Sequence, residues 1–600
     1  MWELLWEVWD RMRQLRLRIH NSSAIFVDNS SFEETEKSCI IGYEEERLSR
    51  IKADSQFPID AINEIKYNVG LNRMKGCEIL ISHWFNFTGA ETPNKYITLQ
   101  DINMLKEIST NIKLVNKDFT HHDAHAYSAY EFRDYFKKQE GNIPVYCIVA
   151  DGFGNNEEVL SIYRRDTGKK PELVKRFYGY EKSLGLFYQY ATSFVGMKEN
   201  QDEYKFLGYE ANINKAFDDA EIRILAEESD KIAEKFKDMY SSAGDAKMVF
   251  AGICCREINY DKLAEIKEEW HKLFADILFK LNFRGSGKTT YAARVAIAFV
   301  VQRTVEKVIN CIVASFGIKY LCLAGGLFYN VKLNNSILTS LIDVDGNLSI
   351  MPLAGDQGAA IGMYAAEEDT PQFPFRTLAI GTRRLYNINK FADNENIFVE
   401  QIPQADDTES IKCLVSEIAD HIADGRIVNI VYGNMEFGPR ALCNTSSVFL
   451  PNAELTAENN TNNKRNEVMP CAPVCTPFAA VNLFSKDELE RVIGSLNFMI
   501  CTLHYTKPHS NMYDGVMHNE TLSTRYTGRP QIVQVDSFMH KLLSRVQNIT
   551  DMKCLVNTSF NNHGNPIVFD TADIISNHKM QCERAIANGT KKPILYVIKY

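Results

Sequence analysis

Two stretches of this sequence share one pattern, and that pattern limits the folds open to the chain. The first contains the apolar runs SAIFVD and KSCIIGYE, and the second contains PVYCIVADGFG followed by EEVLSIYRR. In each stretch an apolar strand ends in a polar loop and another strand begins, which predicts an antiparallel pair. Helical segments follow both pairs, including a long one at residues 291–316. We therefore expect two lobes, each opening with antiparallel strands.

Two later runs and one break in composition define the domain organisation. KYLCLAGGLFYN and LSIMPLAGDQGAAIG each read as a buried strand that ends at glycine before a helix. The segment DTPQFPF is rich in proline and aromatic residues, and SIKCLVSEIADHIADGRIVNIVYG then opens a new helix and strand. A chain of 600 residues exceeds the size of one hydrophobic core. We predict an α/β protein with a first domain at 1–368, a linker at 369–395 and a second domain at 396–600.

The run HHDAH is the strongest candidate for a metal site. On a helix, His121 and His125 lie one turn apart on the same face, which is a metal-ligand spacing. An isolated pair of this kind more often lies on the surface, but three of the 13 histidines fall within these five residues. Imidazoles suit iron, zinc or manganese. Asp356 in AGDQG is a candidate third ligand, although loop aspartates also cap helices.

Other motifs leave two interpretations open. Gly325 and Gly326 allow a nucleotide to approach the backbone, or form only a tight bend, and Asp151 with Gly152 has the same design. RGSGKTT lacks the first glycine of a phosphate-binding loop, so Thr289 or Thr290 is expected to cap a helix instead. In the second domain, the runs FGPRAL, NKRNE and SFN carry groups suited to phosphate, although scattered basic residues more often lie on solvated faces.

Charge and cysteine content narrow the compartment and the partners. A formal net charge of -10 provides no global attraction to nucleic acid or anionic lipid, although a local basic groove remains compatible with it. Fourteen cysteines without paired CxxC spacing indicate reduced thiols and a cytoplasmic protein. The first twenty residues lack the pattern of a signal peptide, and no apolar window is long enough for a membrane span.

Taken together, the motifs resemble the O-carbamoyltransferase family of nodulation-factor and antibiotic biosynthesis. The match follows one order along the chain: HNSSA at His20, EEERLSRIK, HHDAHAYSAY, DGFG, SLGLFY, DEYKFLG, LCLAGGLFYN, PLAGDQG, MEFGPRAL and NTSFNNHGNPIV. This resemblance implies an actin-like first domain with two RNase H-like lobes and a YrdC-like second domain. It also implies that the second domain converts carbamoyl phosphate and ATP, with magnesium, into carbamoyl adenylate. The first domain would transfer the carbamoyl group to an acceptor hydroxyl.

The resemblance also implies roles for particular residues. A metal, with iron ahead of manganese or zinc, would be held by His121, His125 and Asp356. The nucleotide would be held by Asp151, Glu203, Lys205, Gly208, Gly325, Gly326 and Asn330. Carbamoyl phosphate and ATP would bind to Arg440, Lys464, Arg465, Ser559 and Asn561. His20 and His122 are candidates to orient or deprotonate the acceptor hydroxyl.

The sequence departs from the family pattern at three places. Thr445 and Met469 stand where the family has arginines, so the phosphate site is either remodelled or less active in adenylation. The usual strand before the HNSSA position is replaced by MWELLWEVWDRMRQLRL, which leaves the true start and the first strand open.

The acceptor and the competing functions stay open at this level. The acceptor is a small metabolite or, because the composition is typical of an AT-rich genome such as that of a phage, a hydroxymethylated pyrimidine such as hydroxymethylcytosine in DNA. The alternatives are a threonylcarbamoyl-type transferase acting on tRNA and a non-catalytic nucleotide-binding protein of actin-like fold. Neither a membrane partner nor a particular oligomeric state is expected, and a homodimer is one option.

Overall fold

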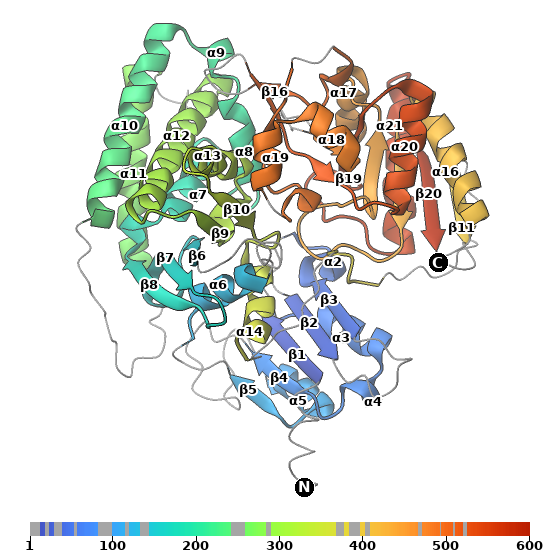
Figure 1. Cartoon of the computed structure of the whole chain (residues 1–600), viewed down its shortest axis with the longest axis horizontal. Coiled ribbons are helices and arrows are strands. Elements are labelled where there is room, and N and C mark those ends of the chain that lie inside the picture. The colour runs from blue at the N-terminus through green and yellow to red at the C-terminus, as the bar shows by residue number, and fades with distance from the viewer. Residues whose placement is uncertain are drawn as a thin grey trace. The chain divides into compact units, whose positions relative to one another are not determined.

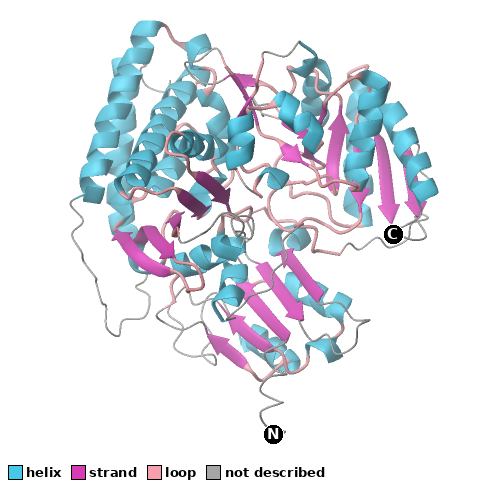
Figure 2. Cartoon of the chain, viewed as in Figure 1, coloured by secondary structure: helices cyan, strands magenta, loops and turns pink. Residues whose placement is uncertain are grey.

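A computed structural model of the chain provides the architecture. It describes residues 13–18, 23–28, 39–52, 57–81, 99–114, 119–131, 143–241, 259–283, 290–367, 377–382, 396–401, 408–465, 471–492, 494–507, 511–519 and 525–599. The chain divides into two compact units. Unit 1 comprises Met1–Glu45, Ala53–Pro374 and Arg491–Gly494, and unit 2 comprises Glu46–Lys52, Phe375–Glu490 and Ser495–Tyr600. Each is a mixture of helices and strands (Figure 2), so the chain is a mixed α/β protein with several sheets.

The first sheet of unit 1 has the strand order β3-β2-β1-β4-β5. Its strands are β1 (Arg13–Arg18), β2 (Ser23–Asp28), β3 (Cys39–Glu44), β4 (Glu78–Ile81) and β5 (Ile112–Leu114). β1, β2 and β3 are antiparallel neighbours, while β4 runs parallel to β1 and β5 parallel to β4. The predicted pairing of SAIFVD with the strand that follows it is thus confirmed. The first strand comes from the amino-terminal run, at RQLRLR.

The second sheet of unit 1 has the order β10-β9-β6-β7-β8. Its strands are β6 (Val145–Ala150), β7 (Glu158–Arg165), β8 (Glu172–Tyr178), β9 (Tyr320–Ala324) and β10 (Asn347–Ile350). Again three antiparallel strands come first, and β9 and β10 then add in parallel. Both sheets therefore share one strand order and one pattern of strand directions, and both predicted antiparallel pairs are present.

The helices of unit 1 connect and cover these sheets. They are α3 (Ile59–Val69), α4 (Leu71–Met74), α5 (Leu99–Ile108), α6 (His121–Glu131), α7 (Leu184–Phe194), α8 (Glu203–Glu210), α9 (Ile213–Ala216), α10 (Asp219–Ser241), α11 (Tyr260–Lys280), α12 (Tyr291–Ser315), α13 (Val331–Ile342) and α14 (Ala359–Glu367). α12 is the predicted long helix, and the Thr290 side chain accepts a hydrogen bond from the Ala293 amide at its start, as expected for a cap. α12 is buried along most of its length beside α10 and α11 (Figure 1), which explains its apolar sequence.

Unit 2 is built on a seven-stranded sheet with the order β11-β20-β12-β13-β19-β14-β18. These strands are β11 (Ile397–Gln401), β12 (Val428–Tyr432), β13 (Thr445–Phe449), β14 (Ala472–Cys475), β18 (Gln531–Ile532), β19 (Cys554–Ser559) and β20 (Ile594–Lys599). A small sheet adds β15 (Leu503–His504), β16 (His518–Asn519) and β17 (Tyr526–Gly528). The helices are α16 (Thr408–Ala423), α17 (Ala453–Asn462), α18 (Pro477–Leu483), α19 (Lys486–Arg491), α20 (Phe538–Thr550) and α21 (Thr571–Ala587).

The core of unit 2 lies on both faces of the large sheet. α16 and α20 pack together over one face (Figure 1), where Ile418 and Leu542 contact strand residues such as Ile430. A smaller apolar group that includes Ile574 of α21 covers the other face. The predicted helix and strand of SIKCLVSEIADHIADGRIVNIVYG are confirmed as α16 and β12. None of the described helices has the length and apolar character of a membrane-spanning helix.

One short segment from the amino-terminal half belongs to unit 2. The helix α2 (Glu45–Ser49) and the residues after it lie in the motif EEERLSRIK. The buried Arg47 guanidinium donates to the Gly438 carbonyl at 2.6 Å, and Arg50 donates to the Ile567 carbonyl at 2.7 Å. Residues 46–52, expected in the first domain, thus pack in unit 2. Of the expected linker, only residues 377–382 are described, and Gly381 pairs with Met435 in unit 2.

Candidate functional site

The helix α6 brings His121 and His125 together, as the spacing of HHDAH predicts. The Nε2 atoms of the two rings lie 3.1 Å apart, and both side chains are buried. Small residues such as Ala124 and Ala126 are also buried on this helix, which allows other elements to approach closely. The two imidazoles therefore face inward rather than toward solvent.

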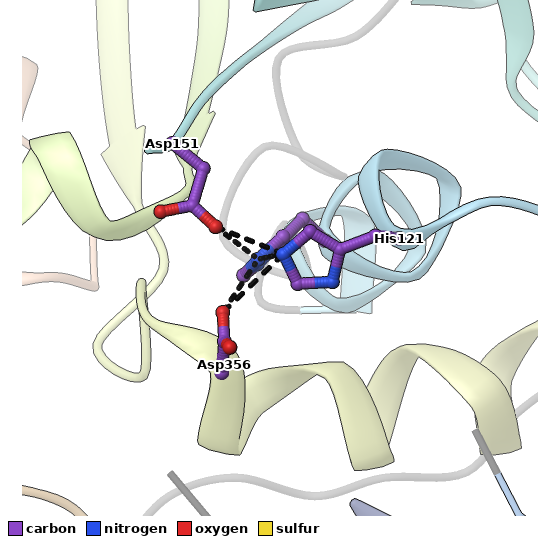
Figure 3. A group of neighbouring side chains, drawn as sticks. His121, Asp151 and Asp356 are labelled. Atoms are coloured by element: carbon purple, nitrogen blue, oxygen red, sulfur yellow. Dashed lines mark hydrogen bonds and ion pairs between the residues drawn. The ribbon is translucent and has the colours of Figure 1, made fainter. Parts of the chain in front are cut away.

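Two carboxylates face these imidazoles, and both follow strands of the second sheet. Asp151 follows β6, and Asp356 comes shortly after β10. Because β6, β9 and β10 are parallel neighbours, their carboxyl ends meet at one edge of the sheet. His121 Nε2 lies 2.8 Å from Asp151 Oδ2 and 3.3 Å from Asp356 Oδ1 (Figure 3). His125 Nε2 lies 3.6 Å from each of the same two oxygens.

Two glycines allow the backbones around this cluster to approach one another. A Cβ on Gly362 of α14 would lie 1.7 Å from the Ala124 carbonyl oxygen, so only glycine allows α14 to cross α6 this closely. Gly325 has a φ of 97°, and a Cβ there would lie 2.2 Å from the Ala150 carbonyl oxygen. The first contact lets the helix after Asp356 lie against the histidine helix, and the second sets the turn after β9 against the residue before Asp151.

The four side chains fit a divalent metal ion. One ligand atom from each of His121, His125, Asp151 and Asp356 lies within 4.8 Å of the others. Two imidazole nitrogens and two carboxylate oxygens form a donor set that iron, zinc and manganese accept. Burial opposes the ionisation of Asp151, but the hydrogen bonds to His121 and His125 outweigh it and lower the pKa of this carboxyl. Asp151 is one of these four side chains, and its predicted contact with the nucleotide stays a prediction.

Gly325, Gly326 and Asn330, which are expected at the nucleotide, follow β9. This strand lies between the two strands that precede Asp151 and Asp356. The Gly326 amide donates to Asp151 Oδ1 at 3.3 Å, so the glycine turn after β9 adjoins the cluster. Asn330 caps α13 through its side-chain oxygen, and its Nδ2 donates to Gln302 Oε1 at 2.7 Å. Gln302 of α12 has no sequence motif around it and was not predicted. Both the oxygen and the nitrogen of the Asn330 side-chain amide thus have partners within the protein.

The remaining nucleotide candidates lie on α8. Lys205 is buried and forms an ion pair with Asp202 at 2.5 Å, and Gly208 lies within the same buried helix. Burial raises the pKa of Glu203 to about 7. Tyr188 lies between this helix and Asn330. The charge of Glu203 affects the pKa of Tyr188, and the Tyr188 hydroxyl contacts Oε1 of Gln302, the partner of Asn330, at 3.5 Å.

Of the two candidates for the base that acts on the acceptor, the structure describes His122 but not His20. His20 lies outside the described residues. The His122 ring is completely buried, and Ser161 Oγ lies 2.8 Å from its Nδ1. That hydroxyl also accepts from Arg176 Nε at 3.0 Å, so the Nδ1 side of the ring faces a serine that belongs to a buried hydrogen-bonded group. Burial also lowers the pKa of His122. The role of His122 stays a prediction, and this geometry does not favour it.

In unit 2 the structure brings three of the predicted anion-binding residues together. Arg465 donates through Nη2 to Ser559 Oγ at 3.1 Å and to Asn561 Oδ1 at 3.2 Å. The Ser559 hydroxyl donates to Asn561 Oδ1 at 2.7 Å. β13 and β14, which flank β19, hold this strand and the SFN turn that follows it in place. A guanidinium, a hydroxyl and an amide thus converge in a group suited to a phosphate.

Two further arginines, Arg440 and Arg529, lie in unit 2. Burial and the neighbouring Arg440 lower the pKa of Arg529 to about 9. Burial raises the pKa of the Cys471 thiol, and the charges of Arg465 and Arg529 partly offset this effect, so both arginines lie near that thiol. Arg529 was not predicted, because the run TGRPQ around it has no recognisable motif. The predicted Lys464 is exposed, and its backbone amide donates to the Thr461 carbonyl at 3.0 Å.

Thr445, which stands where the family has an arginine, has a defined partner. Its hydroxyl donates to Glu436 Oε2 at 2.7 Å, and its amide donates to Glu436 Oε1 at 2.9 Å. The same carboxylate accepts from the amides of Leu442 and Asn444 at 2.8 and 2.9 Å. Thr445 therefore helps a buried glutamate hold the turn that follows Arg440. Met469 lies outside the described residues.

Comparison with known proteins places both parts of the chain in one family. The model of the carbamoyltransferase N-terminus matches residues 111–366, and that of the carbamoyltransferase C-terminus matches residues 419–587. An uncharacterized protein of Methanocaldococcus jannaschii is 25% identical over 93% of this chain and 94% of its own length. Nodulation protein NolNO of Sinorhizobium fredii is 23% identical over 93% of this chain and 76% of its own length.

A solved structure, that of full-length HypF in its phosphate- and nucleotide-bound form, is 14% identical to the chain. The similarity covers 59% of this chain and 46% of HypF with a TM-score of 0.30. A similarity of this size carries no argument about fold or ligands.

Proposed function

The chain belongs to the carbamoyltransferase family and is a carbamoyl-transferring enzyme, and from this premise we propose that it is an ATP-dependent O-carbamoyltransferase with a metal centre in unit 1. In this proposal unit 2 forms carbamoyl adenylate, and unit 1 passes the carbamoyl group to an acceptor hydroxyl. Carbamoyl phosphate, ATP and water yield carbamoyl adenylate, phosphate and pyrophosphate. The acceptor oxygen then bonds to the carbamoyl carbon, and AMP leaves.

The buried cluster in unit 1 is the observation that carries this proposal. His121, His125, Asp151 and Asp356 would hold the metal, with iron as the first candidate and manganese or zinc as alternatives. Bound there, a metal supplies a Lewis acid that polarises a carbonyl toward attack. The turn at Gly325 and Gly326 lies beside the cluster, where the Gly326 amide donates to Asp151 Oδ1, and in this proposal the nucleotide part of the adenylate binds next to it.

The arginines of unit 2 support the adenylation step. Arg465, Ser559 and Asn561 already form one hydrogen-bonded group, and Arg440 lies near enough to Arg529 for its charge to lower the pKa of that arginine. Fixed cations of this kind stabilise the negative charge on phosphates and on a transferring phosphoryl group. Arg529 adds a cation that motif matching did not anticipate, which supports a remodelled phosphate site over a weakened one. Magnesium would accompany ATP in this step.

The finer fold assignment and the compartment belong to the same proposal. The shared strand order of the two sheets in unit 1 supports an actin-like domain with two RNase H-like lobes. A YrdC-like assignment for unit 2 follows from the motif resemblance alone. Every described cysteine is free of a disulfide, which supports a cytoplasmic enzyme.

Two classes of acceptor remain in this proposal. One is a hydroxyl on a small metabolite, and the other is a hydroxymethylated pyrimidine such as hydroxymethylcytosine in DNA. The DNA acceptor needs an extruded or single-stranded base and a local basic surface, because the net charge of the chain is -10.

The first test measures the metal and the adenylation step on the purified full-length chain. We expect about one equivalent of a transition metal by elemental analysis, and pyrophosphate release from ATP that depends on carbamoyl phosphate. The proposal is wrong if the protein contains and binds no metal and releases no carbamoyl-dependent pyrophosphate. Omitting carbamoyl phosphate provides the control for ATP hydrolysis.

The second test distinguishes the acceptors by mass spectrometry. Panels of hydroxylated metabolites and hydroxymethylcytosine DNA are incubated with the enzyme, ATP and carbamoyl phosphate. An added carbamoyl group on the DNA base supports the DNA acceptor. A carbamoyl group found on small hydroxyl metabolites alone rules that acceptor out.

A further inference from the structure

A network of buried charges lies behind the metal-binding cluster. Arg176 of β8 pairs with Glu158 of β7 at 3.2 Å and with Asp123 of α6 at 2.7 Å. The Arg176 side chain is 9% exposed, and Glu158 is fully buried. Tyr163 completes the group, because its hydroxyl donates to Asp123 Oδ1 at 2.6 Å and contacts Arg176. Neither family resemblance nor spacing singled out any of these residues.

The network connects directly to the segments that carry the ligands. Glu158 Oε1 accepts from the His122 amide at 3.0 Å and from the Asn155 amide at 3.2 Å. The Asn155 side-chain oxygen in turn accepts from the His121 amide at 2.8 Å. One carboxylate thus fastens the first turn of α6 to the loop that begins at Asp151.

The second acid of the network acts on the same helix start. Asp123 Oδ2 accepts from the Thr120 amide at 2.7 Å, while its Oδ1 accepts from Arg176. Burial raises the pKa of Glu158, and the charge of the adjacent Arg176 guanidinium opposes this effect. Without the arginine, two buried acids would face each other with no cation between them, which is costly.

We propose that Arg176 is a positioning residue for the metal centre, because it holds the Glu158 and Asp123 carboxylates that fix His121 and Asp151 relative to each other. His121 and Asp151 come from different elements, and their separation decides whether both reach the same ion. Partners behind metal ligands commonly alter metal affinity by about 10- to 100-fold. This inference rests on the metal site of the proposed function.

The test titrates the metal-free full-length protein with Co²⁺ in competition with a chelator, and follows the visible absorption of the bound ion. We expect Arg176→Gln and Asn155→Ala to weaken Co²⁺ binding by about 10- to 100-fold and to change the absorption bands. Arg176→Lys keeps the charge and should restore part of the affinity. Arg164→Gln, which removes an exposed arginine of β7 paired with Asp166, is the matched control and should bind as the parent does.

The outcomes separate this inference from the proposal on which it rests. Circular dichroism and thermal unfolding first establish that each variant folds. If Arg176→Gln does not fold, Asn155→Ala decides, because it removes the connection without leaving a buried charge unpaired. Parent-like affinity and spectra in folded variants overturn the positioning role while the metal site stands. A parent protein that binds no Co²⁺, Zn²⁺ or Fe²⁺ overturns the metal site and this inference together.

Discussion

The candidate sites of the two units use opposite charges for opposite ligands. In unit 1, two carboxylates and two imidazoles converge at the carboxyl ends of parallel strands, and a buried ion network lies behind them. In unit 2, guanidinium, hydroxyl and amide groups converge around β19 and its following turn. The first set is suited to a cation and the second to an anion.

The two sites also differ in how their charges are balanced. His121 and His125 lie near the same carboxylates, so the negative charge of these carboxylates already has partners within unit 1. In unit 2, burial and the charge of Arg440 lower the pKa of Arg529 instead. A bound phosphate would favour the charged form of both arginines. This contrast leads to four predictions.

The largest effect is expected from the histidine cluster. His125→Ala removes an imidazole from the buried donor set, so we expect loss of the bound metal and a fall of carbamoyl transfer by about 10³-fold or more. Carbamoyl-dependent pyrophosphate release should change much less, because unit 2 performs it. Elemental analysis and the two activity assays measure these effects. Equal losses in both assays would contradict a division of labour between the units.

The reverse pattern is expected for Arg465. Arg465→Gln breaks the group formed with Ser559 and Asn561, and we expect pyrophosphate release to fall by about 10²-fold. Metal content should stay at the parent value. Arg465→Lys should recover little, since one ammonium cannot replace two nitrogens of which Nη1 donates to Thr558 while Nη2 donates to Ser559 and Asn561. Full activity in the glutamine variant would remove Arg465 from the anion site.

A smaller effect of mixed sign is expected for Arg529. Arg529→Gln relieves the repulsion from Arg440, so the ligand-free protein should unfold at a slightly higher temperature. Loss of the cation should raise the KM for carbamoyl phosphate or ATP by about tenfold. Thermal unfolding with and without ATP measures both effects. If the variant has a parent-like KM, Arg529 does not contact the anion.

The smallest effects are changes in stability, expected when one glutamate in each unit is replaced by glutamine. Glu436→Gln in unit 2 loses an acceptor for the Thr445 and main-chain hydrogen bonds, and should destabilise the protein by about 1–3 kcal/mol. Glu203→Gln in unit 1 should stabilise the protein instead, by about 1 kcal/mol at pH 8.

The sign for Glu203 follows from its raised pKa. The carboxyl has a pKa of about 7 when folded, above the usual 4.5, so the unfolded chain ionises first as the pH rises. Its destabilising effect is absent below pH 4.5, develops up to about pH 7 and stays above that value. Unfolding midpoints at pH 4.5 and 8 measure the difference. A gain of equal size at both pH values would show that another interaction causes it.

Much of the candidate metal site could be predicted from the sequence. The four-residue spacing of His121 and His125 needs only helical periodicity, and Asp356 follows from a strand that ends at a glycine loop. Asp151 has the same loop pattern, but the sequence could not decide between a nucleotide and a metal for it. That choice depends on which strands are neighbours, because β6 and β10 flank β9 although about 200 residues separate them.

Residues without a local pattern could not be predicted. Glu158 and Arg176 lie within ordinary strands, and only the register that pairs Ser161 with Arg176 places the arginine behind the cluster. Arg47 lies in a recognised motif, yet its contact with Gly438 spans 391 positions along the chain. His122 shares the motif HHDAH with two clustered histidines, but helical geometry turns its ring toward Ser161.

The sequence by itself determined the family resemblance, the paired antiparallel strands of both lobes, the histidine helix and the acid-glycine loops. These features depend on periodicity and on short-range backbone preference, which act between near neighbours. Only the tertiary structure decided that Asp151 lies with His121, His125 and Asp356, that the charge of Arg440 acts on Arg529, and that Arg176 lies behind the candidate site. Each of these depends on strand order and register, which place charges from distant segments within a few ångströms of one another in buried surroundings where unpaired charges are costly.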